Sequence, residues 1–452
     1  MHLNKQLILF RYILSQFGYD SFDILREEFN TRETGTNSSG HTFFASILLN
    51  RSEKLIENQI IFTYDDAIQG YEKKLRESRA EPFLSFKYYQ WFSLLFTEFY
   101  LDQYSQNPET LVSNLNAYKH ASKDFKNIED YSAVDLRKLA FWMATGSGKT
   151  LIMHCNYWQI VKYFPDWENI ILITPNEGLS RQHYDDLTAS GIPAKLYSGS
   201  EESLKTGDGE ILILEITKLV KDKSGEGVSV DVDHFAEYKN LVFIDEGHKG
   251  QKSEERAWKG LREHITRGEG SFTFEYSATF GQIISAGTQD LLQEYGRAII
   301  FDYSYRHFYA DGYGKDFSVF NIDVKNEYTE DQNRLLLSAS LLGFYEQLEL
   351  FDKHKDELRP FNIEKPLWIF VGSKVQGEGN QSDITKVVRF FTFVLKNPSA
   401  FQRLVDSIIS ENSGLINQLG DDIFKNRFTY LKEIKPTADQ ILQKVFHGIG
   451  NI

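Results

Sequence analysis

The sequence contains very little cysteine and no long apolar run. Among 452 residues there is one cysteine, Cys155, so the chain cannot form an internal disulfide and suits a reducing compartment. No stretch approaches the roughly 18 uninterrupted apolar residues of a membrane-spanning helix. The N-terminal stretch is not a secretion signal, because Arg11 and Gln16 interrupt its apolar positions. We therefore expect a cytoplasmic protein with no membrane partner.

An excess of positive charge is also missing. The 64 acidic and 50 basic residues give a net charge of −14, which argues against a surface that binds nucleic acid everywhere. A local basic groove is still compatible with this charge, because an electrostatic field depends on where the charges lie. The sequence is rich in apolar material, with 41% hydrophobic and 14% aromatic residues. Such a chain can bury a sizeable core, and its length predicts two to four structural units.

Strands and helices are expected to alternate in the middle of the chain. The runs RKLAFWMA, NIILITP, GEILILEI, NLVFIDE and TFEYSATF lack polar alternation, which predicts strands covered on both faces, as in a parallel sheet. Amphipathic stretches such as KTLIMHCNYWQIVKYF lie between these runs and predict helices. This order predicts a doubly wound α/β domain from about Leu139 to Phe301.

Four segments are expected along the chain. Residues 1–80 predict a helical accessory region and residues 81–137 an aromatic helical segment, followed by the α/β lobe at 138–315. In residues 316–452, FSVFNIDV and PLWIFVGS predict strands, whereas NRLLLSASLLGFYEQLELFDKH and ITKVVRFFTFVLK predict helices. These elements are too few for a complete domain, so we expect the second lobe to be incomplete. We expect a longer protein, rather than a partner that completes the lobe or a degenerate remnant.

A glycine-rich turn, ATGSGKT, stands between the first predicted strand and helix of the lobe. Its glycines let N–H groups converge on phosphate oxygens, and the helix adds its positive end. Lys149 should reach the β- and γ-phosphates of a nucleoside triphosphate, and the Thr150 hydroxyl should ligate Mg²⁺. The alternative is a chance glycine-rich connection, and Met143 stands where the usual pattern has Gly or Ala. The nucleotide-binding residues predicted here are Thr145, Gly146, Ser147, Gly148, Lys149 and Thr150.

An acidic pair follows another predicted strand, in NLVFIDEGH. A strand that ends in two carboxylates exposes them at the carboxyl edge of the sheet, where α/β folds bind ligands. Asp245 can hold Mg²⁺, and Glu246 can accept a proton from an attacking water. His248 could sense the γ-phosphate or couple to a neighbouring motif. The alternative is that Asp-Glu simply starts a helix.

Two further stretches fit a motor protein, one that uses ATP hydrolysis to drive movement. FEYSATF places Ser277 and Thr279 at a strand end, where their hydroxyls could contact His248 or the acidic pair. LITPNEGLSRQH places Thr174 and Pro175 at another strand end and further polar residues, Arg181 among them, on the next helix.

In this order, ATGSGKT, TPNEGLSRQ, DEGH and SAT resemble motifs I, Ia, II and III of superfamily 2 DEAD/DEAH-type helicases. KLAFWMATGSGKTLIMH and TPNEGLSRQH are most similar to the helicase subunit of type III restriction enzymes. LEITKL, with Thr217, resembles motif Ib, and KPLWIFVGSKV resembles motif IV. PFLSFKYYQ resembles the adenine-reading segment, which makes Gln90 a candidate ATP contact. DEGH departs from DEAH at Gly247, and the resemblance covers roughly Pro82 to Val375.

The resemblance implies a RecA-like P-loop NTPase lobe, whose parallel sheet has helices on both faces, and an incomplete second RecA-like lobe. It implies a DNA helicase or translocase that uses ATP and Mg²⁺ and binds DNA rather than RNA. Restriction or phage defence is the implied setting, with a modification, specificity or other defence subunit as a candidate partner. The implied catalytic residues are Lys149, Asp245, Glu246 and His248, and the implied DNA contacts are Thr174, Pro175, Arg181 and Thr217.

The family's arginine motif, Q-x-x-G-R-x-x-R, is not found after Val375, where Arg389, Arg403 and Arg427 lie in other surroundings. One alternative is therefore an incomplete or partner-dependent module that binds ATP or nucleic acid without independent turnover. Another is a P-loop switch that never moves on nucleic acid. For Arg181, the alternative is an exposed helix face.

Overall fold

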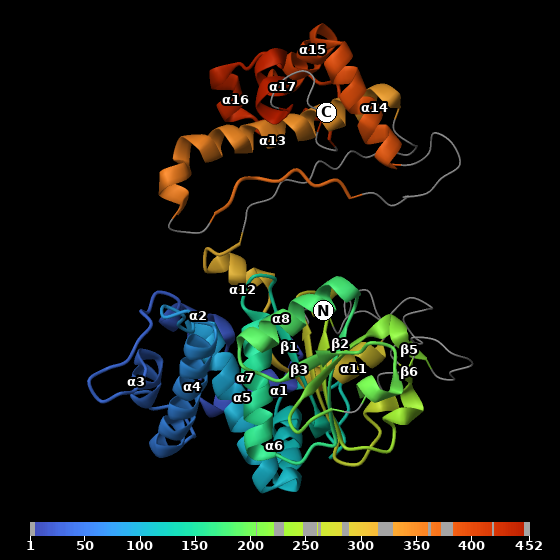
Figure 1. Ribbon diagram of the computed structural model, residues 1–452. Coiled ribbons are helices and arrows are strands. Elements are labelled where there is room, and N and C mark those ends of the chain that lie inside the picture. Colours follow the sequence, from blue (N-terminus) through green and yellow to red (C-terminus); the bar gives the residue numbers. More distant parts are fainter. Residues whose placement is uncertain are drawn as a thin grey trace. The chain divides into compact units, whose positions relative to one another are not determined.

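The computed structural model divides the chain into two compact units, Met1–Lys315 and Asp316–Ile452 (Figure 1). Each unit is described by itself below. The residues that the structure describes are 5–204, 206–220, 230–246, 260, 264–282, 289–314, 329–359, 363–371, 383–417 and 420–446.

Helices form the first part of the Met1–Lys315 unit, as the sequence predicts. Ser21 and Thr42 cap two of them, because their side-chain oxygens accept hydrogen bonds from backbone N–H groups in the first turn. These helices are α1 (Ile8–Gln16), α2 (Phe22–Phe29), α3 (Phe43–Leu49), α4 (Asn58–Ser78), α5 (Tyr88–Gln106) and α6 (Pro108–His120).

A seven-stranded parallel sheet follows, in the order β3-β4-β2-β7-β8-β1-β9. Every residue of β8 and β9 is buried, which is the pattern expected of strands covered on both faces. The predicted α/β lobe is therefore confirmed. Its strands are β1 (Lys138–Met143), β2 (Asn169–Thr174), β3 (Ala194–Leu196), β4 (Ile211–Glu215), β7 (Asn240–Asp245), β8 (Phe272–Ser277) and β9 (Ile299–Tyr303). Its helices are α7 (Lys149–Tyr163), α8 (Glu177–Ala189), α11 (Gln289–Ala298) and α12 (Tyr305–Ala310), and β5 (Leu219–Val220) pairs with β6 (Val230–Asp231) in a small second sheet.

The carboxyl ends of β1, β7 and β8 meet at one edge of the large sheet. Trp142 of β1 pairs with Ser277 of β8, and Asp245 of β7 pairs with Tyr276 of β8. The loops that follow β1 and β7 therefore flank the end of β8. This is the edge at which open α/β sheets bind ligands.

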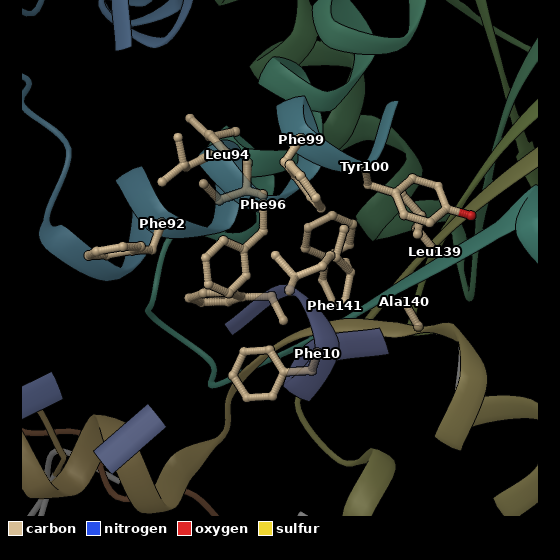
Figure 2. Close-up of a cluster of buried hydrophobic side chains, with 14 of the residues drawn as sticks. Phe10, Phe92, Leu94, Phe96, Phe99, Tyr100, Leu139, Ala140 and Phe141 are labelled. Atoms are coloured by element: carbon tan, nitrogen blue, oxygen red, sulfur yellow. The ribbon is translucent and has the colours of Figure 1, made fainter. Parts of the chain in front are cut away.

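Aromatic side chains of the N-terminal helices pack directly on the sheet. Phe10 of α1, Phe96 of α5 and Phe301 of β9 form a buried trio whose ring centroids lie 5.7–6.2 Å apart. Figure 2 shows Phe10 and Phe96 in one cluster with Phe141 of β1. Burial of each such ring is worth about 1.5–3 kcal/mol. The N-terminal helices and the sheet therefore share one core.

The Asp316–Ile452 unit is helical in its described residues. Leu342, Val394 and Phe401 are fully buried in its own core. Its helices are α13 (Glu330–Leu358), α14 (Asp383–Lys396), α15 (Pro398–Ile409), α16 (Thr429–Ile434) and α17 (Ala438–Phe446). The two helices predicted from the sequence are confirmed as α13 and α14. In neither unit does any described helix combine the length and the apolar character that crossing a bilayer requires.

The prediction of a strand at PLWIFVGS is wrong for the residues of this stretch that the structure describes. In PLWIFVGS, residues 366–371 form neither helix nor strand. The Trp368 ring packs against Phe391, whereas Leu367 and Val371 are 83% and 93% exposed. A strand needs a hydrogen-bonded neighbour, and the described residues of this unit contain no other strand. The other predicted strand, FSVFNIDV, lies outside the described residues, so a second sheet stays a prediction.

Candidate functional site

The turn between β1 and α7 brings backbone N–H groups together. Gly146 and Gly148 have φ angles of 85° and 88°, the left-handed region that glycine adopts without strain. Helix α7 begins at Lys149, so its first N–H groups have no partner within the helix and face the loop. A concave run of N–H groups at the positive end of a helix binds phosphate oxygens. The predicted phosphate loop therefore has two left-handed glycines directly before a helix, and its binding of phosphate stays a prediction.

Neighbouring backbone groups hold this loop in place. The Ser147 hydroxyl donates to the Ala144 carbonyl at 2.7 Å, and the Ala144 N–H donates to the carbonyl of Tyr303 at 2.9 Å. Ser147 is buried, whereas Thr145 and Gly146 are exposed. The loop is therefore anchored to the end of β9 and accessible to a ligand from outside.

Gln90 joins the loop to the start of α5. Its Nε2 donates to the Ser147 carbonyl at 3.1 Å, and its Oε1 accepts from the Lys87 N–H at 2.8 Å. A Cβ atom on Gly148 would lie only 2.4 Å from this Nε2, so the contact requires glycine there. Both ends of the amide are engaged within the protein, and Gln90 positions the loop. A direct contact between Gln90 and a nucleotide base stays a prediction.

Two carboxylates stand at the end of β7. Asp245 is the last residue of the strand, and Glu246 has a φ angle of 55°, which is uncommon outside glycine and concentrated at functional sites. The Nζ atom of Lys149 lies 3.6 Å from Oε1 of Glu246. Residues that are far apart in the sequence, Lys149 and the acidic pair, therefore meet at one site.

His183 is a direct partner of Asp245 that the sequence reasoning missed. Its Nε2 lies 3.0 Å from Oδ2 of Asp245, and its side chain is 5% exposed. Burial alone would raise the pKa of Asp245, but the hydrogen bond and charge of His183, together with the charge of Lys149, hold this pKa below its ordinary value. Asp245 is therefore ionised at neutral pH.

One signal in the sequence could have identified His183. It lies on α8, the helix that follows β2, and β2 pairs with β7, which ends in Asp245. A side chain on the buried face of this helix lies next to the end of β7. His183 follows directly after TPNEGLSRQ, within the stretch from which Arg181 was selected.

The residues at this edge fit a magnesium ion bound to a triphosphate. Mg²⁺ takes oxygen ligands and is usually held by one or two carboxylates together with substrate phosphates. Asp245 is ionised, and its side chain is 12% exposed. Thr150, the second residue of α7, is half-buried beside the phosphate loop. Asp245 and Thr150 would hold the ion.

Ser277 and Thr279 follow β8, the strand between β1 and β7. Ser277 is fully buried, and its Oγ accepts a hydrogen bond from the Thr279 N–H at 3.0 Å. Trp142 of β1 donates its indole N–H to the Ala278 carbonyl at 3.1 Å, which ties this turn to the strand that leads into the phosphate loop. His248 lies outside the described residues, so its catalytic role and the predicted relay through it stay predictions.

Two of the predicted nucleic-acid contacts lie at the end of β2. Thr174 is 1% exposed, and its hydroxyl bonds with that of Ser180 at 2.5 Å. Pro175, the next residue, is half-buried. The Thr174 hydroxyl is thus engaged inside the protein, and Pro175 offers the more accessible surface.

The other two predicted contacts are exposed. The Arg181 side chain is 70% exposed and pairs with Glu177 one turn earlier on α8, at 2.8 Å. The Thr217 hydroxyl donates to a carboxylate oxygen of Glu215 at 2.6 Å. Exposed ion pairs contribute little to stability, so Arg181 can change partner at low cost. Contacts of these residues with nucleic acid stay predictions.

Comparisons with known proteins include a family match to the lobe that carries this site. Residues 112–282 match the family described as type III restriction enzyme, res subunit, and this match includes the phosphate loop, the acidic pair and Ser277 to Thr279. No curated protein matches the chain.

Several solved structures are similar to the chain at low identity. The UvsW helicase from bacteriophage T4 is 19% identical, with 36% of this chain and 54% of that chain covered and a TM-score of 0.27. The Sulfolobus solfataricus SWI2/SNF2 ATPase core in complex with dsDNA is 11% identical, with 66% and 60% covered and a TM-score of 0.26. The Pyrococcus furiosus Hef helicase domain is 13% identical, with 69% and 67% covered and a TM-score of 0.27. This chain thus spans about half the length of the UvsW chain.

Proposed function

We propose that the chain hydrolyses ATP and couples hydrolysis to movement on DNA. The match of residues 112–282 to the family described as type III restriction enzyme, res subunit, supports this proposal. The observation that supports this most directly is the 3.6 Å separation between Lys149 and Glu246 at the carboxyl edge of the sheet. A cation from the phosphate loop and a carboxylate from another strand share one site there. Such an arrangement is typical of phosphoryl transfer, in which positioning and electrostatics supply most of the catalysis.

Lys149 changes partner when the substrate binds. In the structure its ammonium group lies beside the Glu246 carboxylate. The β- and γ-phosphates of ATP carry more negative charge and approach along the N–H groups of the loop, so they replace Glu246 as the partner of Lys149. This exchange removes the contact between Lys149 and the Glu246 carboxylate, which would then face the attacking water molecule.

Glu246 then acts as the general base. As the water oxygen bonds to the γ-phosphorus and the bond to the β,γ-bridging oxygen breaks, the carboxylate takes the proton of the water. Mg²⁺, when bound, neutralises the charge that develops on the phosphates. Asp245 is held in place for the ion by its hydrogen bond from His183. Ser277 and Thr279 would pass the change from the site to the DNA-binding surface.

DNA binding is proposed for the surface around α8 and the turn after β4. Arg181 and Thr217 supply an exposed cation and a hydroxyl there, the groups that contact phosphates without reading sequence. A net charge of −14 restricts such binding to a local surface. A role in restriction or phage defence belongs to this proposal.

A second candidate function is an ATP- or nucleic-acid-binding module without independent turnover. The absence of Q-x-x-G-R-x-x-R downstream of Val375 favours this candidate. An arginine finger is commonly worth about 10³–10⁵ in rate, so a chain without one would hydrolyse ATP slowly until a partner supplied it.

ATP hydrolysis by the full chain, measured with and without DNA, tests the proposal. Wild-type protein should turn over ATP faster when DNA is added. Lys149→Ala should abolish hydrolysis, and Glu246→Gln should bind ATP without hydrolysing it. Lys73→Ala on α4, which removes an exposed lysine with a weak 3.9 Å ion pair, is the matched control and should behave as wild type.

The possible outcomes separate the candidates. Hydrolysis that DNA accelerates and that depends on Lys149 supports the motor. ATP binding without turnover supports the binding module, and turnover that DNA does not change supports a P-loop switch. Normal hydrolysis by Lys149→Ala would remove the phosphate loop from the reaction.

A further inference from the structure

A hollow of about 420 Å³ lies on the Met1–Lys315 unit, where α1, the start of α2 and α12 form its walls. None of the described residues that line it belongs to the phosphate loop, the acidic pair or α8. We propose that this hollow binds a small primary amine, a molecule with one ammonium group on a compact apolar body. The residues that support this proposal are Phe10, Asp20, Phe22, Asp23, Asp302 and His307.

The charges of the hollow favour a cation. Its described lining has four carboxylates and three lysine or arginine side chains, so its net charge is −1 when its histidine is neutral. Two of the three cations already have carboxylate partners, since Arg11 lies 2.9 Å from Asp124 and Arg306 lies 2.7 Å from Asp23. One further positive charge would neutralise the hollow, whereas an anion would add to the excess of negative charge.

Asp302 is the carboxylate in greatest need of a cationic partner. It lies near the end of β9, is 1% exposed, and accepts a hydrogen bond from the Ser304 N–H at 3.0 Å. Of the described lysines and arginines none forms an ion pair with it, and Nε2 of His307 lies 3.9 Å from its Oδ2. Burial raises the pKa of Asp302, because an unpaired charge is costly inside a protein. An ammonium group beside it would stabilise the ionised carboxylate.

His307 adds an acceptor that has no donor. Its side chain is 5% exposed, and its buried Nδ1 has no hydrogen-bond partner among the described residues. Burial holds the pKa of His307 below its ordinary value, although the charges of Asp302 and Asp23 raise it, so the ring is neutral at neutral pH. With the proton on Nε2, towards Asp302, Nδ1 is an acceptor 3.5 Å from another acceptor, Oδ1 of Asp23. An ammonium group has three N–H donors and could serve these acceptors together.

Aromatic rings supply a surface for the apolar body of the ligand. The centroid of Phe22 lies 5.6 Å from that of Phe10 and 4.8 Å from that of His307. Rings of this kind pack against an apolar ligand, and their faces attract a cation. The volume of the hollow is in the range of small-molecule sites, which combine an apolar lining with a few polar groups. An aromatic amine therefore suits the hollow better than a bare metal ion does.

Calorimetric titration of the full chain with three ligands tests the inference. Phenethylamine, phenethyl alcohol and hydrocinnamate share a phenyl ring and a two-carbon chain, but their charges at neutral pH are positive, zero and negative. Phenethylamine should bind saturably, with one molecule per chain. Its affinity should be at least about tenfold higher than that of the alcohol or the acid, because only the amine makes charge-assisted hydrogen bonds with the carboxylates.

Two variants test the carboxylates. Asp302→Asn keeps the shape of the side chain but removes its charge, so it should weaken the amine at least about tenfold. Asp20 is exposed where it lines the hollow, so Asp20→Lys leaves the core intact and should weaken the amine about threefold or more. Asp66→Lys is the matched control, because Asp66 is an exposed aspartate of α4 that does not line the hollow, and the Kd should stay unchanged.

Absence of saturable phenethylamine binding would overturn the inference. Equal affinity for the amine and the alcohol, or tighter binding of hydrocinnamate, would also overturn it, since the carboxylates would then not select the ligand. Equal weakening by Asp20→Lys and Asp66→Lys would reduce the effect to the overall charge of the protein and would contradict a built site. The amine should bind equally well to the chain saturated with Mg·ATP, and loss of binding there would place it in the nucleotide site instead of the hollow.

Discussion

Replacement of Asp311 by alanine should destabilise the Met1–Lys315 unit by about 3–5 kcal/mol, the usual cost of removing one partner from a buried ion pair. The variant leaves the guanidinium of Arg26, of which 15% of the side chain is exposed, without its carboxylate. It also takes the acceptor from the hydroxyls of Tyr88 and Tyr303. Asp311→Asn keeps the shape and part of the hydrogen bonding but loses the charge, so its cost should be smaller.

Urea unfolding, followed by tryptophan fluorescence, measures this effect. A double-mutant cycle with Arg26→Met identifies its cause. If the cost comes from a stranded cation, Asp311→Ala should cost far less in the Arg26→Met background than in wild type. A coupling below about 0.5 kcal/mol would refute the reasoning, because Arg26 and Asp311 would then contribute independently.

Two further predictions concern the site itself. His183→Phe removes the hydrogen bond to Asp245, so half-maximal ATP hydrolysis should need about 10–100-fold more Mg²⁺, the usual effect of losing a group that orients a metal ligand. An unchanged Mg²⁺ dependence would contradict this role. Gly148→Ala places a Cβ atom against Gln90 and forces a left-handed alanine, which costs about 1–2 kcal/mol. ATP binding should weaken in this variant, and wild-type affinity by calorimetry would contradict the loop geometry.

The sheet and the phosphate site could be predicted because their signals are local. Continuous apolar runs identified the central strands, and the carboxyl ends of parallel strands share one edge. Lys149 and the acidic pair could therefore be expected to meet, and the Nζ atom of Lys149 lies 3.6 Å from Oε1 of Glu246. This inference needed only the order of the elements and the residue that follows each strand.

Contacts that depend on packing could not be predicted in the same way. Asp311 pairs with Arg26 across 285 positions of the chain, and no local pattern marks either residue. His183 contacts Asp245 because it lies on the buried face of α8. Which face of a helix is buried depends on how the helix is rotated about its axis, and the motif does not specify this rotation. PLWIFVGS has the composition of a buried strand, but composition does not show whether neighbouring strands are present to cover Leu367.

Binding of Mg·ATP to Glu246→Gln, with and without Lys149→Ala, tests the central claim most directly. Calorimetry on Glu246→Gln measures binding without turnover, since the general base is removed. We predict that Glu246→Gln binds Mg·ATP and that adding Lys149→Ala weakens this binding by at least about tenfold, as the loss of a charge-assisted contact requires. Equal affinity in the single and double variants would contradict a shared site for the triphosphate at the end of β1 and β7.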